Sequence, residues 1–199
     1  MPCRYRTLIE TMFWLSAIVV AGIVLVAVLY NRLVRDRNRV DAAWSDIDVQ
    51  LQRRHDLIPQ LVKAVDGYAG YERATLEAVT TLRAEAMKFT GPTDIDRRGE
   101  KEQQLGEGLQ RLIAVAEQYP DLKANENFLS LQNDLVDTEN HIQFARRFYN
   151  GSVRQLNTRV ETVPNNFIAS GFGFNQREFF QKTSDEAAAV PRVDLGITK

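Results

Sequence analysis

Histidine and carboxylate side chains on two helical stretches are the residues best suited to chemistry in this chain. There are two histidines, His55 and His141, and Asp137 lies one helical turn before the second. Imidazole and carboxylate groups on neighbouring helices can bind a metal ion. Di-iron sites in helix bundles use Glu-x-x-His pairs, however, and the sequence contains none. We therefore expect no metal and no cofactor, and keep a ligand- or metal-binding sensor as the alternative hypothesis.

Other charged residues on the same two stretches define a candidate polar groove. Their residue types would allow general acid–base catalysis by a hydrolase, but no nucleophile elbow, phosphate loop or dinucleotide fingerprint accompanies them. Interhelical salt bridges and a solvated face are the interpretation we favour, and we expect no enzymatic activity. The candidate groove consists of Asp46, Asp48, Arg53, Arg54, His55, Asp56, Asp137, Glu139, His141 and Arg146.

Net charge and cysteine content exclude several classes of protein. The formal net charge is −1 and the sequence pI is about 6.2, so the chain as a whole lacks the positive field that gathers nucleic acid. Its one cysteine, Cys3, excludes a disulfide within the chain and a multi-cysteine zinc site.

An uncharged apolar run predicts a membrane anchor. The run extends over 12–30, with Trp14 near one end and Tyr30 at the other, where interfacial aromatic residues are expected. A helix of this length spans about 28 Å, close to the hydrocarbon core of a bilayer. A cleaved signal peptide is the alternative, but it should have a shorter apolar region and small residues at its cleavage site. We therefore predict a short flank over 1–11 and a retained transmembrane helix over 12–30.

Arginines around this run predict its orientation. More of them follow the run than precede it, which favours an outward N-terminus and a cytoplasmic C-terminal region. The same residues could contact anionic lipid headgroups. The candidate lipid contacts are Arg32, Arg35, Arg37 and Arg39.

Apolar residues at three- and four-residue steps predict that the region over 31–164 is helical. The anchor should continue as one long helix whose apolar residues form a seam, the row of side chains on one face. Arg54 is a charged residue at a seam position, and we expect a bend near Pro59. Further helices are expected over 72–88 and over 125–164, and between them a third helix that ends at Pro120. Arg159 is one of three polar residues in the seam of the helix over 125–164. The predicted fold class is all-α, an N-terminal transmembrane helix continuing into an antiparallel four-helix bundle.

The end of the chain differs in composition from the helical region. The segment over 165–182 is rich in phenylalanine and glycine, and we expect it to fold back on the bundle or on the membrane surface. The stretch over 183–199 is expected to be loosely ordered.

Two long stretches resemble a known family. YNRLVRDRNRVDAAWSDIDVQLQRRHDLIPQLV, from Tyr30 to Val62, and VAEQYPDLKANENFLSLQNDLVDTENHIQFARRFYNGSVRQLNTRVETVPNNF, from Val115 to Phe167, closely resemble the LemA family. The resemblance implies a bacterial membrane protein, a bromodomain-like arrangement of four helices and no established catalytic residues. The chain departs from the family pattern at Gly151, where aspartate is expected, and at Leu156, where tyrosine is expected.

Together these features favour a membrane-anchored scaffold or adaptor in the bacterial cytoplasmic membrane. The expected partners are the lipid bilayer and unidentified membrane or peripheral proteins, with homo-oligomers possible and nucleic acid excluded. The resemblance further implies roles in membrane organisation or membrane-protein quality control.

Overall fold

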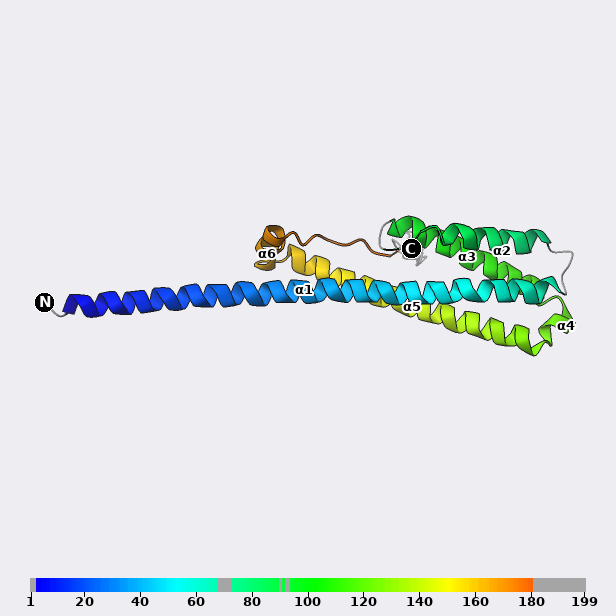
Figure 1. Cartoon of the computed structure of the whole chain (residues 1–199), viewed down its shortest axis with the longest axis horizontal. Coiled ribbons are helices and arrows are strands. Elements are labelled where there is room, and N and C mark those ends of the chain that lie inside the picture. Colours follow the sequence, from blue (N-terminus) through cyan, green and yellow to red (C-terminus); the bar gives the residue numbers. More distant parts are fainter. Residues whose placement is uncertain (1–2, 68–72, 90, 92–93, 181–199) are drawn as a thin grey trace, which may run out of the picture. The chain divides into compact units, whose positions relative to one another are not determined.

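A computed structural model of the chain describes residues 3–67, 73–89, 91 and 94–180. Regular secondary structure within this part of the chain is entirely helical, which confirms the predicted all-α class. The elements are α1 (Cys3–Asp66), α2 (Arg73–Ala86), α3 (Ile95–Ala116), α4 (Pro120–Lys123), α5 (Glu126–Glu161) and α6 (Asn165–Phe172) (Figure 1).

The chain divides into two compact units. Unit 1 combines Met1–Gln52 with Thr138–Glu178, and unit 2 combines Arg53–Asp137 with Phe179–Lys199. The region over 31–164, predicted as one bundle, is therefore described as two units, and the four-helix arrangement itself stays a prediction. The predicted tail over 183–199 lies outside the described residues.

Helix α1 continues without a break from the apolar run into the charged sequence that follows, as predicted (Figure 1). An 18-residue window in it has a mean hydropathy of 2.7, and only 6% of that window is buried. The side chains from Met12 to Val28 are all exposed, whereas a core helix of a soluble protein would be covered on at least one face. By length and composition α1 can therefore cross a membrane.

In unit 1, α1 and α5 run antiparallel. The ring of Trp44 on α1 lies 5.4 Å from that of Tyr149 on α5, and nearer the start of α1 Asp36 pairs with Arg159, nearer the end of α5. Val40, Ile47 and other members of the predicted seams are buried there because they face the partner helix. Most residues that the periodicity predicted for these two seams are buried, whereas Val163, at the end of the α5 seam, is 71% exposed.

Two side chains of α5 bind the backbone of the segment that follows α6. The hydroxyl of Tyr149 donates to the carbonyl of Glu178 at 3.0 Å, and burial raises the pKa of Tyr149 to about 12, so the hydroxyl stays protonated. The side chain of Asn157 both donates to the carbonyl of Arg177 and accepts from its N–H, each at 2.9 Å. These bonds fix the backbone of the segment at 177–178.

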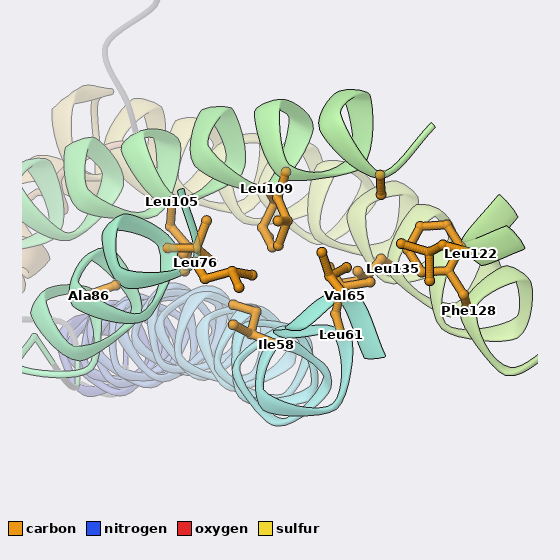
Figure 2. Close-up of a cluster of buried hydrophobic side chains, with 13 residues drawn as sticks. Ile58, Leu61, Val65, Leu76, Ala86, Leu105, Leu109, Leu122, Phe128 and Leu135 are labelled. Carbon is orange, nitrogen blue, oxygen red and sulfur yellow. The ribbon is translucent and has the colours of Figure 1, made fainter. Parts of the chain in front are cut away.

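Unit 2 is built around a continuous apolar cluster, shown in Figure 2. Leucine side chains dominate it, and most are almost fully buried. Residues from α1, α2, α3, α4 and α5 contribute, so each helical segment of the unit covers part of one core. The labelled members are Ile58, Leu61, Val65, Leu76, Ala86, Leu105, Leu109, Leu122, Phe128 and Leu135.

Helix ends follow local sequence signals. Asn125 caps α5, since its Oδ1 accepts from the N–H groups of Asn127 and Phe128 at 2.9 and 3.2 Å. Helix α6 ends at Gly173, which has a φ of 72° that glycine adopts without strain. The predicted helices over 72–88 and 125–164 are confirmed within a few residues, whereas α4 and α6 were not predicted, because such short helices have too few turns for their periodicity to show.

Candidate functional site

A buried ion cluster in unit 2 is the main concentration of charge inside the described structure. Glu102 of α3 is 0% exposed, and Arg54 and His55 of α1 are 2% and 4% exposed. Arg54 Nη2 forms an ion pair with Glu102 Oε2 and also donates to the Glu102 carbonyl at 3.1 Å. His55 Nε2 lies 3.0 Å from Glu102 Oε1. Each carboxylate oxygen of Glu102 therefore has a neighbouring nitrogen from α1.

The ionisation of Glu102 follows from these neighbours. Burial by itself raises the pKa of this carboxyl, because it disfavours the charged form. The hydrogen bond from His55 and the positive charge of Arg54 outweigh the burial, and the pKa of Glu102 lies below its ordinary value. The carboxyl is therefore a charged acceptor at neutral pH, which a buried acid can be only when it is paired.

Pro59 and Arg83 complete the surroundings of His55. In a helix the N–H of residue 59 would bond to the carbonyl of residue 55, but proline has no N–H. Arg83 Nε, from α2, donates to the His55 carbonyl at 2.7 Å instead. Helix α1 continues through Pro59, and the acceptor that proline leaves open is used by a second helix. The predicted bend near Pro59 stays a prediction.

Gly106 of α3 lies next to the cluster. It follows Glu102 by one turn, and a Cβ at this position would lie 3.7 Å from Arg54 Nη1, an ordinary van der Waals contact. The turn of α3 after Glu102 therefore also borders the guanidinium group of Arg54.

A second ion pair, with a buried carboxylate and a partly exposed arginine, lies in unit 1. Asp36, 4% exposed, pairs with Arg159 and accepts from Gln155 Nε2 at 3.1 Å. Arg146 of α5 is buried as well. A buried carboxylate favours the alignment of α1 and α5 that keeps it paired, because an unpaired buried charge is costly.

The predicted groove residues have different surroundings. Only Arg54, His55 and Arg146 are buried; Arg53 forms an exposed pair with Asp134 at 3.5 Å, and Glu139 accepts from Gln143 at 2.9 Å. Asp48 is half-buried, and the remaining members are exposed: Asp46, Asp56, Asp137 and His141.

The proposed metal ligands do not come together in the part of the chain that the structure describes. His55 is buried, whereas Asp137 and His141 are exposed. Among the described residues no group of three or more His, Cys, Asp or Glu side chains could hold one metal ion. The sensor hypothesis therefore gains no support from the geometry.

Sequence reasoning missed Glu102, although a signal for it exists. Continuing the α3 seam of Leu105 and Leu109 towards the N-terminus places Glu102 and Arg98 in apolar positions, and both are buried. A buried charge in the seam of one helix requires an opposite charge in the seam of another. Arg54 is the charged residue in the seam of α1 that could have been matched with Glu102.

The four candidate lipid-contacting arginines are all exposed. Two also contact aromatic rings within unit 1: Arg37 lies 5.3 Å from the ring centre of Phe174, and Arg39 lies 5.3 Å from that of Phe148. Arg32 and Arg35 lie within two helical turns of the end of the apolar run. Their charges are placed where a bilayer surface would be if that run spans the membrane.

An all-helical fold with a long, exposed apolar N-terminal helix indicates the class of membrane-associated helical proteins. The family model described as LemA family matches residues 43–195, and the chain belongs to the LemA family.

Several relatives are similar over most of their length. The chain is 28% identical to Protein LemA of Metamycoplasma hominis, covering 83% of this chain and 72% of the relative. It is 27% identical to Magnetosome protein MamQ 2 of Paramagnetospirillum magneticum, covering 82% and 69%. Magnetosome protein MamQ of Magnetospirillum gryphiswaldense is 26% identical, covering 87% and 73%.

Proposed function

We propose that this protein is a membrane-anchored adaptor of the bacterial cytoplasmic membrane, which presents its helical surface to protein partners. The anchor is the apolar part of α1, which is long enough to span a bilayer and almost entirely uncovered by the rest of the chain. A role in organising membranes is supported by relatives that are named as magnetosome proteins.

The observation that carries the partner-binding part is a set of large apolar side chains left exposed on unit 1. Phe144 is 65% exposed and Phe148 39%. They lie four residues apart on α5, so their side chains are neighbours on one face of this helix. Large apolar side chains exposed next to each other are typical of protein-binding surfaces.

Photo-crosslinking in living cells tests this proposal. A photoreactive phenylalanine analogue replaces Phe144 in the full chain, and a matched variant carries it at Arg154, an exposed polar position on the same helix. We expect a discrete adduct from position 144, absent at position 154, that disappears when the gene of the crosslinked protein is deleted. No specific adduct at position 144, together with an unchanged membrane proteome on deletion of this chain, would overturn the proposal.

A further inference from the structure

The segment that contains α6 is apolar, uncharged and only partly covered. From Val163 to Gln176 the sequence has no charged side chain. Val163 is 71% exposed, Phe167 70% and Phe172 59%. Burying one large apolar side chain stabilises a structure appreciably, so three exposed ones without an intervening charge indicate a surface that is covered by something other than water.

The buried side of the same segment packs on α1. Ala169 and Phe174 form a cluster with Leu33, to which Ile168 of α6 adds a partly buried side chain. The ring of Tyr30 lies 4.9 Å from that of Phe172 and 5.7 Å from that of Phe174. These contacts fix α6 beside the turn of α1 that begins at Tyr30 (Figure 1).

This position coincides with the end of the membrane anchor, and here the argument rests on the proposed function. If 12–30 spans the hydrocarbon core, Tyr30 lies at its boundary, in a headgroup layer about 5–8 Å thick. A ring in contact with Tyr30 lies at the same depth. Arg32 and Arg35, exposed within the next two turns, are then level with lipid phosphates.

We propose that α6 is a second membrane contact. Val163, Phe167 and Phe172 enter the boundary between headgroups and acyl chains, in the leaflet where α1 leaves the bilayer. Arg32 and Arg35 pair with anionic headgroups beside them. The partner is a phospholipid surface rather than a protein, because the exposed ring of Phe172 contacts Tyr30 at the end of the apolar anchor.

Such a contact has a mechanical consequence for unit 1. A single transmembrane helix leaves the attached region free to rotate about the helix axis. A second contact away from that axis removes this freedom. The exposed face of Phe144 would then hold one direction relative to the membrane, which is useful for an adaptor.

Spin-label accessibility in lipid nanodiscs that contain anionic phospholipid tests the proposal with the full chain. The background is Cys3→Ser, and single labels are introduced by Phe167→Cys, by Gly151→Cys as an exposed control on α5, and by Val20→Cys in the anchor. Oxygen partitions into lipid, and a nickel chelate stays in water. We expect position 167 to favour oxygen several-fold more than position 151, and less than position 20.

Each other result separates the two proposals. If position 20 is in lipid but position 167 is as accessible to nickel as position 151, the α6 contact is wrong and the anchor stands. If position 167 is shielded from both reagents, protein covers it and the lipid contact is wrong. If position 20 is itself accessible to nickel, the anchor fails, and the α6 contact fails with it.

Discussion

At the scale of single residues, Glu102 decides how α1 and α3 pair. It is fully buried and is held by Arg54 and His55 from the other helix. The cluster is structural in character, since its groups contact one another and are screened from solvent. Its value is specificity of helix pairing more than net stability, because desolvation offsets much of the attraction.

Replacing this carboxylate should be costly. Glu102→Gln leaves the charge of Arg54 buried without its counter-charge, and we expect a loss of about 3 kcal/mol in the free energy of unfolding. Glu107→Gln on the same helix is the control, because Glu107 is exposed and its pair with Arg111 spans 3.9 Å at the surface. Urea unfolding of the detergent-solubilised chain, followed by circular dichroism, measures both. Equal losses in the two variants would contradict the structural role of the cluster.

Acidification should act through the same residue. The pKa of Glu102 in the folded state lies below the free value of 4.5, so the unfolded state binds more protons as the pH falls. The stabilisation by Glu102 is complete above the free value and is lost as the pH falls through the lowered one. We expect unfolding curves recorded from about pH 6 to about pH 3.5 to show a shallower decline for Glu102→Gln than for the original chain. Parallel declines would show that other acids account for the effect.

At the scale of elements, two residues that are unfavourable inside a helix, Pro59 and Gly108, each lie at a contact with a second helix. Pro59 frees the His55 carbonyl, and Arg83 of α2 donates to it at 2.7 Å. Gly108 of α3 allows close approach of α2, since a Cβ there would lie 2.9 Å from Leu82 Cδ1. Both residues weaken one helix and strengthen its packing against another.

A double-mutant cycle tests the role of Pro59. Arg83→Met removes the donor and leaves a buried carbonyl unsatisfied, at a cost of about 1–3 kcal/mol. In a Pro59→Ala background the new N–H can bond to the His55 carbonyl, so the same change should cost less. Thermal or urea unfolding of the four proteins gives the coupling energy. An equal cost in both backgrounds would exclude the compensation.

Two glycines should respond oppositely to alanine. Gly151 is exposed inside α5, and a Cβ there would meet nothing within 4 Å, so Gly151→Ala should raise the free energy of unfolding by about 1 kcal/mol. Gly108→Ala has the same helical gain but must displace Leu82, so we expect little gain or a loss. Unfolding curves of the two variants decide this, and equal gains would show that α2 and α3 are not packed closely at Gly108.

At the scale of the whole molecule, the orientation in the membrane determines which partners are accessible. The proposed orientation places the N-terminus outside and the helical region in the cytoplasm. On intact cells, a membrane-impermeant maleimide should therefore label Cys3 in the original chain and should not label a Cys3→Ser/Gly151→Cys variant. The reverse pattern would place the helical region outside the membrane and contradict the orientation inferred from the arginines.

The sequence alone determined the features that depend on local order along the chain. The uncharged run over 12–30 and the seams on α1 and α5 each involve residues within a few turns of one another. Length and periodicity are properties of a single segment. For this reason the all-helical class and the long continuous α1 could be predicted before the structure was considered.

Only the tertiary structure decided which charged residues in these apolar seams pair with one another. Periodicity shows that Arg54 and Arg159 lie on apolar faces, but not that Glu102 and Asp36 face them. Likewise, the sequence offered two places for the phenylalanine-rich segment, and contacts with Tyr30 and Leu33 placed its helix α6 beside α1. The physical reason is that a residue's type determines the kind of partner it requires: an opposite charge for a buried charge, an apolar surface for an aromatic ring. Which residue supplies that partner depends on how distant segments pack.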